Sequence, residues 1–228
     1  MIYSEYSVES AATLVRRVFG WTTLGLTISG LTAFMLSLFP AIQKDLVMKP
    51  GVMLILILAQ LGLVLYLSFG LERMSSGSAI AAYLLYSFVT GVTLSTLFIV
   101  FTGASLALTF FICAAMFAVM AIYGLITKSD LSGLGTFLFM GLIGLIIAGF
   151  INMFVQSAKI DFVASIFGVF IFTIFTAYDV QMVKKMGMMM LGTGADMTKV
   201  SIIGALKLYL DFVNLFLYLL RFFGQKKD

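Results

Sequence analysis

The sequence predicts an all-α membrane protein, a bundle of seven transmembrane helices in which the seventh helix is central. Of its 228 residues, 62% are hydrophobic and only 11% are charged, a balance that the surface of a water-soluble domain does not tolerate. The apolar residues form seven long runs, each close to the roughly 20 residues that a helix needs to cross the membrane. The runs are continuous and lack the alternation of a membrane β-barrel, so each is expected to be a helix.

The expected helices follow one another with mostly short links, which favour antiparallel neighbours in one bundle. Their ranges are 18–39, 52–69, 79–101, 104–126, 133–156, 162–184 and 201–222. Together they form one domain, residues 18–224, after a polar segment at 1–17 and before a short basic tail at 225–228. The two longest links are expected at 40–50 and, in a Met-rich stretch, at 184–200.

The charged residues indicate anchors at the membrane surface rather than a nucleic-acid interface. The 14 Lys and Arg residues, which give a formal charge of +4, are scattered over links and termini. There is no histidine, and Cys113 is the one cysteine, so the sequence offers no transition-metal cluster and no intrachain disulfide. We therefore expect no cofactor and no nucleic-acid partner, with Cys113 as a small core residue.

The first 17 residues bear on the orientation of the chain. They contain Glu5 and Glu9 and do not resemble a secretory signal peptide, so the first helix is expected to remain in the protein. Arg16 and Arg17, next to this helix, favour a cytoplasmic N-terminus. Because the number of spans is odd, the C-terminus is then expected outside.

Two aspartates within the last two apolar runs, Asp179 and Asp211, are the strongest functional signal. An ionised carboxylate at the centre of a membrane helix costs about 2.5 to 3.5 kcal/mol on insertion scales, so a chain keeps one mainly for function. At 1.5 Å per residue, Asp179 lies roughly 8 Å and Asp211 roughly 15 Å from the cytoplasmic ends of their helices. A modest tilt would bring the two carboxylates close together, and Arg73, just past the second helix, lies on the same side.

The last helix carries a polar seam along one face. Residues at three- and four-residue spacing form it: Gly204, Lys207, Asp211, Asn214, Tyr218 and Arg221. Such a seam is expected to face the bundle interior or a water-filled cavity, which is why the seventh helix is predicted to be central. Lys207 has two explanations, a static ion pair with Asp211 or a side chain that reaches toward water. On the sixth helix, Thr176 is one turn before Asp179 and could form a hydrogen bond on the same side.

Two strings near the end of the chain carry a family resemblance. TAYDVQMVKKM at 176–186 and SIIGALKLYLDFVNLFLYLLRFFG at 201–224 resemble the closing motifs of the Bax inhibitor-1, or transmembrane Bax inhibitor motif, family. The similarity continues upstream in TKSDLSGLGTFLFMGLIGLI at 127–146 and YSFVTGVTLS at 86–95. It covers most of the chain from the first helix onward and indicates a bacterial-type member, located in the inner (plasma) membrane.

The resemblance implies a last helix surrounded by the other six and a pH-sensitive leak of calcium ions across the bilayer. The family's paired-aspartate sensor falls on Asp179 and Asp211, and its arginine switch partner falls on Arg73. From the residues alone, Arg73 is equally explained as an anchor at the membrane surface. The hypothesis is that a proton shared by the two aspartates holds the cytoplasmic side shut, and that deprotonation, or pairing of Asp179 with Arg73, opens it. The same oxygens would hold calcium transiently, with Asn214, backbone carbonyls or water completing the site.

Three other functions compete with a channel. A calcium/proton exchanger would use the same acids with alternating access. A transport-inactive regulator would bind proteases or cell-death factors as membrane partners, as the family name suggests. An intramembrane aspartyl protease is disfavoured, because Asp211 lies in LYLDF rather than Gly-x-Gly-Asp, and a chain whose only prolines are Pro40 and Pro50 lacks a Pro-Ala-Leu segment. We therefore do not expect an enzyme.

Overall fold

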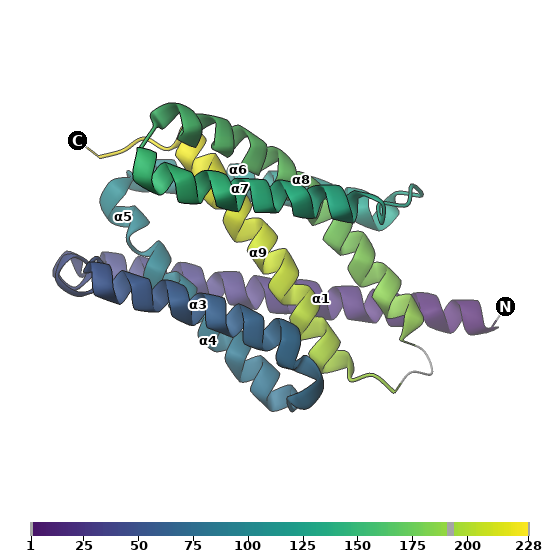
Figure 1. Ribbon diagram of the computed structural model, residues 1–228. Coiled ribbons are helices and arrows are strands. Elements are labelled where there is room, and N and C mark those ends of the chain that lie inside the picture. Colours follow the sequence, from purple (N-terminus) through teal and green to yellow (C-terminus); the bar gives the residue numbers. More distant parts are fainter. Residues whose placement is uncertain (1, 191–193, 228) are drawn as a thin grey trace. The chain divides into compact units, whose positions relative to one another are not determined.

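A computed structural model describes residues 2–190 and 194–227, and most of them are helical (Figure 1). The elements in chain order are α1 (Ile2–Ser37), α2 (Pro40–Ile42), η1 (Gln43–Val47, a π-helix), α3 (Pro50–Gly70), η2 (Leu71–Arg73, a 3-10 helix), α4 (Ser76–Leu94), α5 (Leu97–Val100), α6 (Gly103–Ile126), α7 (Leu134–Val155), α8 (Ala158–Met189) and α9 (Met197–Phe223). β-structure in the described ranges is limited to an isolated bridge between Phe101 and Lys226. The all-α prediction is confirmed.

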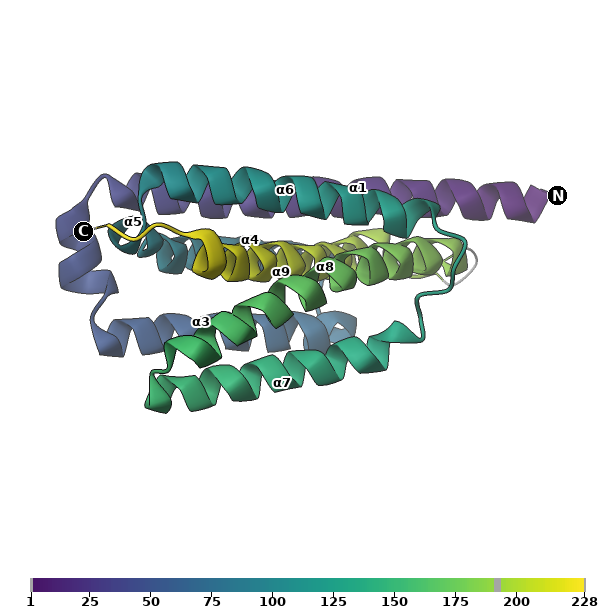
Figure 2. The same cartoon turned by 90° about the horizontal axis from the view of Figure 1, so that it is seen from above.

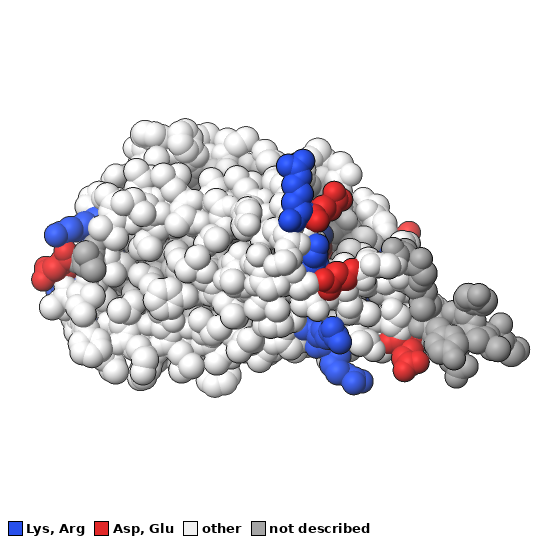
Figure 3. Space-filling view, turned by 90° about the horizontal axis from the view of Figure 1, so that it is seen from below, with Lys and Arg blue, Asp and Glu red and all other residues white. Residues whose placement is uncertain are grey.

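Seven helices within the described residues are long and apolar enough to cross a membrane, as predicted. They are α1 from Ser7, α3, α4 together with α5, α6, α7, α8 and α9. Lys, Arg, Asp and Glu side chains gather at a few places on the face drawn in Figure 3, which leaves most of that face uncharged. An uncharged surface of this kind is suited to hydrocarbon and not to water.

The largest differences from the predicted helix ends are at the start of α1 and at the end of α8, and the third predicted helix is divided into α4 and α5. Residues 2–17 are helical and continue directly into the first span, and α8 extends to Met189 instead of ending at 184. Met and Lys are good helix formers, so the Met-rich stretch continues the helix to Met189. Within the expected link at 184–200, residues 191–193 lie outside the described residues, and α9 begins at Met197. Within the extension of α8, Gly187 permits a close approach to α1, because a Cβ there would lie 2.6 Å from the Cα of Ala11.

The chain divides into two compact units, and each is described by itself. The first unit comprises Met1–Thr102, Gly187–Tyr209 and Lys226–Asp228. In it α4 packs against both α1 and α3. A Cβ on Gly91 of α4 would lie 2.7 Å from the carbonyl oxygen of Ser29, so this glycine lets α1 and α4 approach closely.

A polar and aromatic cluster joins the first half of α9 to α1 and α4 in the first unit. The Ser29 hydroxyl lies 2.6 Å from the Ser87 carbonyl oxygen, to which it donates, and 2.6 Å from the Tyr209 hydroxyl. The fully buried ring of Tyr209 packs edge-on against Tyr83 and Tyr86. Tyr209 is therefore a packing residue whose hydroxyl has a partner, as buried tyrosines require.

The second unit comprises Gly103–Met186 and Leu210–Gln225, which covers α6, α7, most of α8 and the second half of α9. α7 and α8 lie side by side at the turn that joins them and move apart away from it (Figure 2). Toward the far end the long side chain of Tyr178 still reaches α7, where a Cβ on Gly135 would lie 2.6 Å from its hydroxyl oxygen. Tyr178 thus also acts in packing.

The last helix is the most buried of the seven. In an apolar stretch of 18 residues in this helix, 61% of the residues are buried, compared with 33% or less in the corresponding stretch of each of the other six. The burial covers several faces of the helix, including Leu208, Tyr209, Phe212 and Leu215. The position of this helix at the centre of the bundle stays a prediction.

Candidate functional site

Both intramembrane aspartates belong to the second unit, and both are buried. The exposed fraction is 6% for Asp179 on α8 and 4% for Asp211 on α9. Because the helices are longer than predicted, Asp179 precedes Met189 by ten residues and Asp211 follows Met197 by fourteen. At 1.5 Å per residue these distances are about 15 Å and about 21 Å, so each carboxylate lies deeper along its helix than the sequence indicated.

Contacts between α8 and α9 establish the register of this antiparallel pair. The rings of Phe172 and Tyr218 stack with centroids 5.8 Å apart, and a Cβ on Gly168 would lie 2.4 Å from the Tyr218 ring. Seven residues after Phe172 comes Asp179, and seven residues before Tyr218 comes Asp211. Seven residues are close to two helical turns, so each aspartate lies two turns from its ring on the same face of its own helix. That the two carboxylates meet stays a prediction.

Side chains from α6 pack around the α9 residue that follows Asp211. The Phe212 ring contacts Phe110 and Phe117 edge-on, with centroids 5.6 Å and 5.4 Å apart. The thiol of Cys113, buried as predicted, lies 3.6 Å from the Phe212 carbonyl oxygen, to which it donates. This packing attaches α9 to α6 at the residue next to Asp211.

The two predicted supporting residues form hydrogen bonds within their own helices. The buried Thr176 hydroxyl donates to the carbonyl of Phe172, at 2.9 Å. The partly exposed Asn214 donates its amide nitrogen to the carbonyl of Leu210, at 2.8 Å. The amide oxygen of Asn214 is therefore the group on this side chain that could coordinate a cation.

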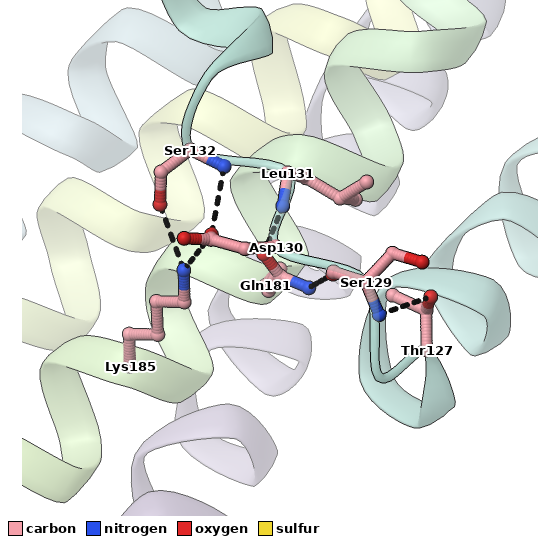
Figure 4. Close-up of polar contacts among 7 residues, drawn as sticks. All are labelled: Thr127, Ser129, Asp130, Leu131, Ser132, Gln181 and Lys185. Carbon is pink, nitrogen blue, oxygen red and sulfur yellow. Dashed lines mark hydrogen bonds and ion pairs between the residues drawn. The ribbon is translucent and has the colours of Figure 1, made fainter.

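Gln181, two residues after Asp179, attaches α8 to the link between α6 and α7 (Figure 4). Its side-chain oxygen accepts from the Leu131 amide at 2.8 Å, and its side-chain nitrogen donates to the Ser129 carbonyl at 2.8 Å. Gln181 and Leu131 are both buried. One side chain thus satisfies two backbone groups of the link, 127–133, which would otherwise lose their partners on burial.

Two lysines extend this attachment. Lys185 forms an ion pair with Asp130 and donates to the Ser132 hydroxyl at 2.7 Å (Figure 4). Lys184 donates to the Leu125 carbonyl at the end of α6, at 2.7 Å. The hydrogen bond from Lys185, together with those from Ser132, holds the pKa of the Asp130 carboxyl well below its usual range. The pair is exposed, so its contribution to stability is small.

The sequence did not single out Gln181, Lys185 or Asp130. Their signal was present in the polar strings TKSDLS and YDVQMVKK, which flank apolar runs. The sequence alone does not predict that the link at 127–133 contacts the C-terminal part of α8. The roles of these residues were therefore identified only from the structure. We call this cluster of Gln181, Lys184, Lys185 and link 127–133 the α8 anchor.

The structure places the remaining predicted residues on exposed surfaces. Arg73 ends η2 in the first unit, and Lys207 lies on the first-unit half of α9; both side chains are exposed. The pairing of Arg73 with Asp179, and the choice between the two explanations of Lys207, stay predictions. Among the residues described, His, Cys, Asp and Glu do not gather in groups of three that could hold a metal ion. Calcium would therefore need carbonyl, amide or water oxygens beside the two carboxylates.

These features define an integral membrane protein of seven apolar helices that buries an acid in each of its last two. The family model described as "Inhibitor of apoptosis-promoting Bax1" matches residues 11–228. The chain therefore belongs to the Bax inhibitor-1 family, as the sequence motifs indicated.

Bacterial relatives support this assignment. The chain is 42% identical over 216 residues to the inner membrane protein YbhL of Escherichia coli K12, which covers 94% of this chain and 92% of the relative. It is 44% identical over 212 residues to an uncharacterized protein of Borreliella burgdorferi, and the match covers 93% of this chain and 91% of the relative. A membrane protein of Streptococcus pyogenes is 37% identical over 163 residues, or 72% of this chain and 70% of the relative. The words inhibitor and membrane protein in these descriptions point to a non-enzymatic membrane protein.

Proposed function

We propose that this protein is a pH-sensitive calcium leak channel in which Asp179 and Asp211 share a proton. The observation that carries the proposal is the register of α8 and α9, in which the Phe172–Tyr218 stack is two turns from both aspartates. Two carboxylates that face each other out of water cannot both ionise cheaply, so they titrate as a coupled pair. A chain without histidine can sense pH in this way.

In the proposed mechanism the shared proton holds the cytoplasmic side shut. Loss of the proton leaves two negative charges that repel each other, and Asp179 turns to Arg73 as its partner. The released carboxylates, together with the Asn214 amide oxygen, backbone carbonyls or water, then provide the oxygen ligands that a passing calcium ion prefers. The membrane is the bacterial inner membrane, with the N-terminus in the cytoplasm, which places the α8 anchor on the cytoplasmic side.

The test is calcium entry into dye-loaded proteoliposomes over a pH series. We expect the parent flux to rise as pH rises through the titration of the pair, and Asp179→Asn and Asp211→Asn each to lose that pH dependence. Asp45→Asn, at an exposed aspartate of η1, is the matched control and should follow the parent. If Asp211→Asn kept both flux and pH dependence, the mechanism would be wrong.

Two further outcomes would replace the channel with another function. Calcium accumulation against its gradient, driven by an imposed proton gradient, would indicate a calcium/proton exchanger that uses the same acids. Absence of parent flux at every pH would indicate a transport-inactive regulator that acts on membrane-protein partners.

A further inference from the structure

An open apolar groove lies between α7 and α8 in the second unit, close to the turn that joins them. It encloses about 480 Å³, and apart from one lysine its lining residues are apolar or glycine. The lining residues are Gly141, Gly144, Leu145, Ala148, Lys159, Ile160, Val163, Ala164, Phe167 and Ile171. The side chains of Val163 and Phe167 are exposed, so the groove opens onto the surface that faces lipid.

Small residues create the groove. Gly144 and Ala148 on α7 lie opposite Ala164 on α8, and a Cβ added to Gly144 would meet no atom within 4 Å. Gly141, three residues earlier on α7, differs, since a Cβ there would lie 2.7 Å from the Cδ1 atom of Ile171. The space beside Gly144, an exposed position, is therefore open to an occupant such as a hydrocarbon chain.

A second, polar hollow of about 380 Å³ adjoins the groove. The two share the lining residues Leu145, Ala148, Ile160 and Ala164. The polar hollow is also lined by Asn152, Asp161, Tyr218 and Arg221. The Arg221 guanidinium lies 3.4 Å from the Asp161 carboxylate and 5.5 Å from the centroid of the Tyr218 ring. An apolar groove and a hollow rich in hydrogen-bonding groups thus lie next to each other along α7 and α8.

The charge of the two hollows is positive. Lys159 and Arg221 supply two cations against the single carboxylate of Asp161, and Lys159 is exposed. Lys159 also lies in the first turn of α8, which starts at Ala158, where the backbone dipole adds partial positive charge. Guanidinium and ammonium groups are preferred partners of phosphate oxygens.

We propose that these hollows bind one phospholipid whose headgroup carries a net negative charge. One acyl chain occupies the groove beside Gly144, the phosphate is held between Lys159 and Arg221, and Asn152 meets the glycerol or headgroup hydroxyls. With a cytoplasmic N-terminus this lipid belongs to the outer leaflet, because α8 then starts at the outer surface. The site is independent of calcium transport and stands if the leak does not.

The first test compares lipid retention by native mass spectrometry. The full chain is released from nanodiscs that contain equal amounts of phosphatidylglycerol and phosphatidylcholine with the same acyl chains. We expect the parent to retain phosphatidylglycerol in preference, and Lys159→Gln to reduce that preference about fivefold, as expected for loss of one charge-assisted contact. Lys49→Gln, at the exposed lysine that directly precedes α3, is the matched control and should keep the preference.

The second test fills the groove. Gly144→Leu should reduce retention of both lipids, whereas Gly62→Leu, at an exposed α3 glycine that also has no atom within 4 Å of an added Cβ, should not. Equal retention of the two lipids by the parent, or an unchanged preference in Lys159→Gln, would overturn the proposal. So would a change from dimer to monomer in Gly144→Leu with unchanged lipid retention, because the groove would then be an interface between two copies.

Discussion

The two ends of α8 differ, although Lys159 near its start and Lys185 near its end both belong to the second unit. Toward the C-terminal end, the α8 anchor attaches the helix to its neighbours with hydrogen bonds from Gln181, Lys184 and Lys185. At the N-terminal end, small residues leave two adjoining hollows next to Lys159 and Arg221. The end near Asp179 is therefore held in place, while the other end can accept a ligand.

Two glycines show how the same residue type serves both ends. A Cβ on Gly124 of α6 would lie 2.4 Å from the carbonyl oxygen of Ala177 in α8, so this glycine permits a close backbone approach. A Cβ on Gly144 would meet nothing within 4 Å. One glycine is required by packing and the other leaves space, and the difference lies in what faces each of them.

The largest expected effect comes from enlarging Gly124. Gly124→Leu forces side-chain atoms into the backbone of α8, and we expect the unfolding free energy to fall by on the order of 3 kcal/mol, the upper range for overpacking. Gly144→Leu adds the same atoms to an open groove and should leave stability unchanged or slightly raised, because leucine favours a helix more than glycine. Equilibrium unfolding in mixed micelles measures both. If Gly124→Leu and Gly144→Leu lost equal unfolding free energy, the two glycines would not differ in packing, and the distinction between the two ends of α8 would be wrong.

A smaller effect is expected from Gln181→Ala. The variant leaves the buried Leu131 amide and the Ser129 carbonyl without their partner, which costs about 1 to 3 kcal/mol. Hydrogen exchange at the Leu131 amide should also be faster in Gln181→Ala than in the parent. Gln181→Glu still accepts from Leu131 and should keep part of the protection, and Gln225→Ala, at an exposed side chain, should change neither quantity. Unaltered exchange in Gln181→Ala would show that the link is held by other contacts.

The smallest effect is expected from the exposed ion pair. The pKa of Asp130 is lowered in the folded protein, so the pair stabilises the fold above the unfolded pKa of about 4 and loses this contribution as pH falls further. The difference in unfolding midpoint between the parent and Asp130→Asn should thus be present at pH 7 and vanish on acidification. Asp45→Asn serves as the control for an exposed aspartate. A difference that grew on acidification would contradict the assignment.

The predicted membrane class and helix number were confirmed because they depend on composition and run length alone. Long apolar runs cannot remain in water, and within lipid only a helix satisfies its own backbone. Helix ends were predicted less well, because the Met-rich stretch after Lys185 was interpreted as a link although its residues favour a helix. The close approach of Gly187 to Ala11 in α1 is a separate, long-range contact, which leaves no local signal in the sequence.

In the candidate site, too, some features were predictable from the sequence and others depended on tertiary contacts. The sequence by itself identified Asp179 and Asp211, because a carboxylate inside an apolar run is costly wherever the helix lies. Only the tertiary structure decided that Phe172 and Tyr218 set the register between their helices, that Gln181 holds the link at 127–133, and that Gly144 borders a groove. Burial cost belongs to a residue and its neighbours in the chain, whereas register and packing gaps belong to pairs of helices that meet only on folding.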